Sequence, residues 1–82
     1  MTELRVLLFA RARDLAGAEA VTVPLPAGAT VADLRRALAA RVPALAGLLG
    51  RSAVGVNGDF ADNDLVLPSG AEVALLPPVS GG

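Results

Sequence analysis

Short apolar runs alternate with turn residues along the first third of the chain. Leu4 to Ala10 is apolar apart from Arg5, and such a run is typical of a central strand that is covered on both faces. Residues 20–25 alternate in polarity and contain Pro24, which favours a strand at the edge of a sheet. Residues 11–16 between them predict a short helical turn. Because this connection is short, we expect the two strands to pair antiparallel.

One segment in the middle of the chain has a clear helical periodicity. Apolar residues recur there at helical spacing, and the arginines fall mainly outside that stripe; the apolar positions are Val31, Leu34, Leu38 and Val42. Thr30 and Asp33 have the spacing of a capping box, with Asp in the place of the usual Glu. Pro43 ends this helix or begins a short second one that closes at Gly50.

The last third of the chain again predicts strands. Residues 52–56 form a third apolar run, and Asn57-Gly58 after it is the strongest short hairpin signal. Residues 59–62 are then the returning strand. Residues 72–76 predict the last strand, which ends at Pro77-Pro78 because proline has no backbone N–H for a ladder.

This order of elements predicts an α+β fold of the β-grasp (ubiquitin-like) type. We expect a mixed sheet of four to five strands with one main helix packed across it. A chain of 82 residues encloses a single core. We therefore expect one β-grasp domain over residues 1–76 and a flexible C-terminal tail over residues 77–82.

The composition excludes most side-chain catalysis. The sequence contains no Cys, no His and no Lys, so thiolate, imidazole and Schiff-base chemistry are absent, and no metal site is expected. The net charge of −1 argues against nucleic acid as a partner. No apolar run reaches the length of a membrane span or of a signal-peptide core, so we expect a cytoplasmic protein without a membrane partner.

The tail supplies a different chemistry. Pro77-Pro78 favours an extended backbone, and Gly81-Gly82 has no side chain to obstruct entry into a narrow tunnel. The group delivered there is the carboxylate of Gly82. Adenylation makes such a carboxylate electrophilic, and a sulfur donor can then displace AMP to leave a thiocarboxylate. A terminal Gly-Gly by itself is more often an inert end, so the weight rests on its context.

The whole chain resembles the small, sulfur-carrying subunits of molybdopterin synthase. These belong to the ubiquitin-like sulfur carriers, a family that also includes the thiamine-biosynthesis carrier. The motifs that support the resemblance are Val6-Leu7-Leu8-Phe9-Ala10, Arg13-Asp14-Leu15-Ala16-Gly17, Val56-Asn57-Gly58, Gly70-Ala71-Glu72-Val73-Ala74-Leu75-Leu76 and Pro77-Pro78-Val79-Ser80-Gly81-Gly82. The last of these is the most specific.

The resemblance implies a carrier that is not catalytic alone. An E1-like adenylyltransferase would use ATP to form a transient acyl-adenylate at Gly82, with no permanently bound cofactor. A sulfurtransferase or cysteine desulfurase would supply the sulfur. The tail, from Pro77 and Pro78 through Val79, Ser80 and Gly81, would then enter the large synthase subunit within a heterotetramer. There Gly82 would donate sulfur to precursor Z.

The resemblance also implies a surface that binds partners beside the tail. The matching positions are Phe9, Phe60, Leu76 and Arg13. Plain core packing is the alternative for the apolar residues, and a solvated turn is the alternative for Arg13. The acidic residues Asp59, Asp62 and Asp64 lack the rest of a calcium-loop pattern and fit turns better.

Other functions use the same tail. One alternative is a carrier for thiamine, tRNA thiolation or cysteine synthesis, and another is a ubiquitin-like modifier of protein lysines. A chain without Lys cannot be the target of its own chain formation, although it can modify other proteins. A β-grasp interaction module with an inert tail is the last alternative.

Overall fold

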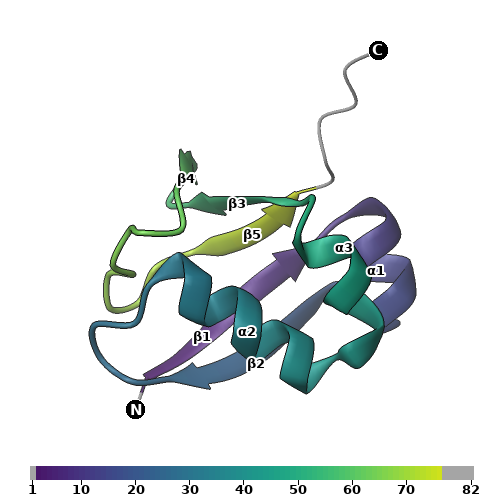
Figure 1. The fold of residues 1–82 in the computed structure, drawn as a ribbon, viewed down its shortest axis with the longest axis horizontal. Helices are drawn as coiled ribbons and strands as arrows, with labels where there is room; N and C mark the ends of the chain where they lie inside the picture. The colour runs from purple at the N-terminus through teal and green to yellow at the C-terminus, as the bar shows by residue number, and fades with distance from the viewer. Residues whose placement is uncertain (1, 77–82) are drawn as a thin grey trace.

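Five strands form one mixed sheet in the computed structural model, which describes residues 2–76 (Figure 1). The strands are β1 (Thr2–Leu8), β2 (Ala20–Leu25), β3 (Ala53–Val56), β4 (Asp59–Ala61) and β5 (Val73–Leu76), and their spatial order is β2-β1-β5-β3-β4. Strand β5 lies between β1 and β3, parallel to β1, and every other pairing is antiparallel. This arrangement confirms the predicted β-grasp fold.

Helix α2 (Val31–Arg41) lies across one face of this sheet (Figure 1). Three shorter segments complete the helical part of the described chain: α1 (Ala10–Ala16), the 3₁₀ turn η1 (Pro43–Leu45) and α3 (Ala46–Leu49). Helix α1 ends at Gly17, whose φ of 69° is the left-handed conformation common at helix ends. Pro43 begins η1, so the predicted second helical segment after α2 is present.

The N-terminus of α2 has the predicted capping box. The Asp33 backbone N–H donates to the Thr30 hydroxyl, and the Thr30 backbone N–H donates to the Asp33 carboxylate at 2.9 Å. These bonds satisfy backbone donors that a helix start otherwise leaves free. The hydrogen bonds from Thr30 hold the pKa of the Asp33 carboxyl below its ordinary value.

The core lies between α2 and the sheet face beneath it. Helix α2 contributes Val31, Leu34 and Leu38, each 0% exposed. The sheet contributes alternate residues of its strands: Leu4, Val6, Leu8, Val23, Leu25, Val54, Val56, Val73 and Leu75. Aliphatic side chains therefore fill the core, and neither Phe takes part in it.

The first strand differs from its prediction. It runs from Thr2 to Leu8 instead of from Leu4 to Ala10, because Ala10 has a φ of 51° and begins α1. It is covered on one face only: Arg5 is exposed and Leu7 is half-buried, so the expectation of two covered faces is wrong. The apolar run arises because the uncovered face is itself partly apolar at this strand.

Pro24 lies within β2, which is an edge strand as predicted. The Leu8 N–H donates to the Glu19 carbonyl, so Glu19 is bonded to β1. Bonded and non-bonded pairs alternate along an antiparallel ladder, so Val23, opposite Leu4, is also bonded to β1 and Pro24 is not. The missing N–H of Pro24 thus falls on the outer edge, where it breaks no ladder bond.

Candidate functional site

The sheet face opposite α2 has an apolar surface near the end of β5. Directly opposed residues of paired strands share a face. Leu7 opposes Ala74, Ala74 opposes Gly55, and Gly55 opposes Phe60. These residues alternate with the core positions of the same strands, so they point away from α2.

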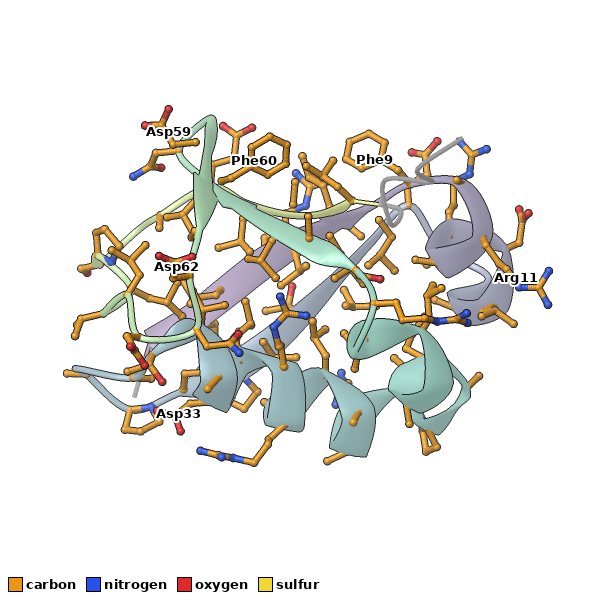
Figure 2. All side chains as sticks on the ribbon, turned by 45° about the horizontal axis from the view of Figure 1, so that its top comes forward. Phe9, Arg11, Asp33, Asp59, Phe60 and Asp62 are labelled. Carbon is orange, nitrogen blue, oxygen red and sulfur yellow. The ribbon has the colours of Figure 1, made fainter. Side chains whose placement is uncertain are left out.

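A groove of about 250 Å³ crosses this face. It is lined by Leu7, Phe9, Gly55, Gly58, Asp59, Phe60, Glu72, Ala74 and Leu76. Phe60 is 76% exposed and Phe9 is 42% exposed, and Figure 2 shows both rings on the side of the sheet away from α2. Exposed aromatic side chains around an apolar hollow are typical of a surface that binds another protein.

Gly55 provides the space in the middle of the groove. A Cβ at this position would lie 3.7 Å from the Leu76 Cδ1 atom and 3.8 Å from the Asp59 carbonyl oxygen. These are ordinary contact distances, so nothing in the backbone demands glycine here. A side chain longer than Ala would occupy the hollow between Phe60 and Leu76.

The hairpin between β3 and β4 presents Phe60 at the groove. Asn57 and Gly58 have φ values of 51° and 90°, which suit a two-residue turn that matches the twist of the strands. Phe60 is the middle residue of β4, opposite Gly55. The hairpin predicted from Asn57-Gly58 therefore accounts for the exposure of this ring.

Three of the four predicted surface residues meet at this groove. Phe9, Phe60 and Leu76 line it together, whereas Arg13 lines an adjoining hollow with Phe9 and Glu19. Asp59 and Glu72 thus line the groove, and the cationic side chain of Arg13 lines the hollow next to it. The binding of a partner by these residues stays a prediction.

Strand β5 ends at Leu76, inside the wall of the groove. The predicted tail residues Pro77, Pro78, Val79, Ser80, Gly81 and Gly82 lie outside the described residues. The groove and the root of the tail are therefore neighbours on one face of the sheet.

Leu7, Gly55 and Ala74 also line the groove, and they were not predicted from the sequence. All three residues lie in segments that the sequence predicts as strands. Each is flanked in its strand by buried residues, so it faces the other side of the sheet. Small and apolar residues on alternate positions could have marked this second face. The pairing that joins them across three strands could not be read from local patterns.

The acidic residues near β4 do not form a metal site in the structure. Asp62 lies in a turn, where its carbonyl accepts a hydrogen bond from the Leu65 N–H. Across residues 2–76, no group of three acidic side chains is placed to hold a metal ion. Within the same residues, no helix has the length and hydropathy needed to cross a membrane.

The amino-acid sequence of the chain matches a known protein family. Residues 6–82 match the family model described as the ThiS family. The chain is 40% identical to the molybdopterin synthase sulfur carrier subunit of Escherichia coli, over 96% of this chain and 99% of that protein.

Solved structures give a consistent result. A crystal structure of the small archaeal modifier protein 1 of H. volcanii matches with a TM-score of 0.87 and 32% identity, over 96% of this chain and all of that one. A complex of subunits 1 and 2 of the molybdopterin-converting factor of Helicobacter pylori contains a chain that matches with a TM-score of 0.68 and 26% identity, over 99% of this chain and all of that one.

Proposed function

The chain belongs to the ThiS family, and from that membership we propose that it is the sulfur-carrier subunit of a molybdopterin synthase. The similarity to the E. coli subunit covers nearly the full length of both proteins. The observation that supports the proposal best is the exposed apolar groove, because it contains Leu76 at the root of the Gly-Gly tail. A carrier needs such a surface to dock while its tail reacts elsewhere.

In this proposal the reacting group is the Gly82 carboxylate. One of its oxygens attacks the α-phosphate of ATP on an E1-like enzyme, and pyrophosphate leaves. A donor persulfide then attacks the carbonyl carbon, the C–O bond to AMP breaks, and an acyl disulfide joins the carrier to the donor. A thiol acts as the reductant: it attacks the donor-side sulfur, the S–S bond to the carrier breaks, and the carrier leaves as the thiocarboxylate while the thiol and the donor form a disulfide. Without Cys, His or Lys, the body of the carrier has no strong nucleophile that would compete for the activated tail.

The groove is the proposed docking surface for the large synthase subunit. The matched Helicobacter protein is part of a complex of two subunits, which supports a two-subunit assembly here. Phe60 has the highest exposed fraction among the large apolar side chains that the structure describes, and aromatic anchors often dominate the binding energy of an interface. Docking would deliver the tail to the active site of the large subunit, where precursor Z takes up the sulfur.

Reconstitution tests the proposal directly. The carrier is incubated with ATP, the activating enzyme and a sulfur donor, and its intact mass is measured. We expect an oxygen-to-sulfur exchange that disappears when Gly82 is deleted, together with molybdopterin formation in the presence of the large subunit. A Val66→Ala variant, changed far from the tail in sequence, serves as the matched control. Wild-type molybdopterin formation by the Gly82 deletion would refute the role of the tail.

A second candidate function is protein modification, favoured by the similarity to the small archaeal modifier protein 1. The same activated carboxylate would form an amide with a lysine of a target protein. Incubation with ATP and cell extract should then produce conjugates that contain this chain. Carriers for thiamine synthesis or tRNA thiolation share the first steps, and the activity assay with the large subunit separates them.

A further inference from the structure

Asn57 connects the β3–β4 turn to the strand that leads into the tail. Its backbone N–H donates to the Glu72 carbonyl at 2.8 Å, and its side-chain Oδ1 accepts from the Glu72 backbone N–H at 2.9 Å. Glu72 directly precedes β5 and lines the groove. Both backbone polar groups of Glu72 are thus bonded to one residue of the turn.

The backbone conformation of Asn57 explains why a side chain is needed for the second bond. Val56 opposes Val73, so Asn57 and Glu72 form the next opposed pair of the β3–β5 ladder. In a hydrogen-bonded antiparallel pair, the backbone carbonyl of each residue accepts from the backbone N–H of the other. At a φ of 51°, Asn57 has already turned into the hairpin, and its Oδ1 replaces its carbonyl as the acceptor. The ladder is thereby extended by one bond into the turn.

The two segments that Asn57 joins both line the groove. The hairpin carries Phe60, and β5 ends at Leu76. Among the described strands, β4 pairs with β3 alone, through only three pairs of residues. So short an edge ladder leaves the orientation of the hairpin weakly determined. A bond from the turn to the segment before β5 supplies a second point of attachment.

We propose that Asn57 is a positioning residue for docking: its side chain holds the β3–β4 hairpin against the start of β5, and so orients Phe60 over the groove. This inference rests on the proposed function, because the partner concerned is the large synthase subunit. It adds a requirement that the exposed aromatic ring alone does not explain. The ring must be held in place before the partner arrives.

Three substitutions separate the contributions of Asn57. Asn57→Gly adopts the left-handed backbone without steric strain and removes the Oδ1 acceptor, although glycine adds an entropic cost to folding. Asn57→Asp keeps an acceptor, and Asp tolerates this backbone conformation. Asn57→Ala loses both properties. Calorimetric titration with the purified large subunit measures the affinity of each variant. The titrations are done at two salt concentrations, because salt screens the charge that Asp adds.

We expect Asn57→Gly to weaken binding about fivefold, on the scale of one net hydrogen bond. We expect Asn57→Asp to stay within about twofold of wild type on the same scale, and Asn57→Ala to be weaker than Asn57→Gly. A purely structural role would lower the melting temperature of Asn57→Gly and leave the affinity of the folded protein unchanged. Wild-type affinity of folded Asn57→Gly would overturn the inference.

A double-mutant cycle tests whether Asn57 acts through Phe60. In a Phe60→Ala background, Asn57→Gly should have no further effect on affinity, whereas additive losses would overturn the inference. If Phe60→Ala itself binds normally, the proposed docking surface fails. If Phe60→Ala is weak and Asn57→Gly is normal, only the role of Asn57 fails.

Hydrogen exchange gives a second measurement that does not depend on a variant. The Glu72 amide of the wild-type carrier should be protected from exchange by its bond to Oδ1. Binding of the large subunit should raise this protection further, because docking holds the hairpin in one orientation. A Glu72 amide that exchanges as fast as a free turn amide would overturn the inference.

Discussion

The two faces of the sheet use the same strands for different purposes. On the face beneath α2, Leu34 and Leu38 of the helix are 0% exposed and pack against aliphatic strand residues. On the opposite face, no helix among the described residues covers the strands (Figure 1), and the ring of Phe60 lies on that side (Figure 2). This side chain is 76% exposed and lines the groove. One face holds the fold together, and the other is available to a partner.

Strand β3 shows how closely the two purposes are interleaved. Val54 and Val56 are buried in the core, and Gly55 between them forms part of the groove. Because side chains alternate across a strand, adjacent residues can be changed with separate effects on stability and on binding. Substitutions on the two faces should therefore produce two different classes of defect.

The largest effect is expected on the covered face. Leu34→Ala should lower the free energy of unfolding by about 2–5 kcal/mol, because it leaves a cavity in a fully buried site. Urea denaturation measures the loss. Leu15→Ala on α1, where the side chain is 38% exposed, is the matched control and should cost much less. Equal losses at the two positions would mean that α2 does not cover the core as described.

The next effect is expected on the open face. Phe60→Ala should weaken binding of the large subunit by about 30-fold, which is the loss of about 2 kcal/mol typical of an aromatic anchor. Its free energy of unfolding should change by no more than about 0.5 kcal/mol, since the ring is exposed. Surface plasmon resonance and denaturation measure the two quantities.

Val66→Ala is the control for that experiment. Val66 is 55% exposed but does not line the groove, so its truncation should leave the affinity unchanged. A variant of Phe60 that binds normally but unfolds easily would reverse the assignment of the two faces.

Filling the groove should have a smaller effect than removing its aromatic ring. Gly55→Leu should weaken large-subunit binding by about tenfold, or about 1.4 kcal/mol, because its side chain occupies the hollow beside Leu76. Gly55→Ala, whose Cβ meets Leu76 at an ordinary distance, should bind within about threefold of wild type. A Gly55→Leu protein with undiminished affinity would show that the partner does not enter the groove.

The smallest effect concerns the helix cap on the covered face. Hydrogen bonds from Thr30 lower the pKa of Asp33 below its ordinary value of 3.8. The stability that Asp33 contributes is therefore complete above this pH, and it is lost as the pH falls through the lower pKa of the folded state. Asp33→Asn should flatten this part of the pH–stability curve without changing large-subunit affinity at neutral pH. An unchanged curve would show that the bonds to Thr30 do not stabilise the carboxylate.

Much of the fold was predictable because its signals are local. The capping box at Thr30 and Asp33 and the hairpin at Asn57-Gly58 depend on residues that are neighbours in sequence, and the structure confirms both. The end of the first strand was predicted wrongly. No residue type near Ala10 announces a positive φ, and the apolar run continues past Leu8.

The candidate site was predictable only in part. Phe9, Phe60 and Leu76 were selected through a family resemblance, and the structure brings them around one groove. Gly55, Leu7 and Ala74 were missed, because a small or apolar residue in a strand gives no sign of which face it occupies. Asn57 was recognised as a turn residue, while its bond to Glu72 spans fifteen positions in sequence.

The sequence by itself determined the order of the elements, the main amphipathic helix and the absence of Cys, His and Lys from the chain. These depend on local backbone preferences and on composition. The tertiary structure alone decided the registers in which β5 pairs with β1 and β3, and that Phe9, Phe60 and Leu76 line one groove. The physical reason is that a sheet face is built by pairing between distant segments, and a register shift of one residue would turn each side chain to the other side.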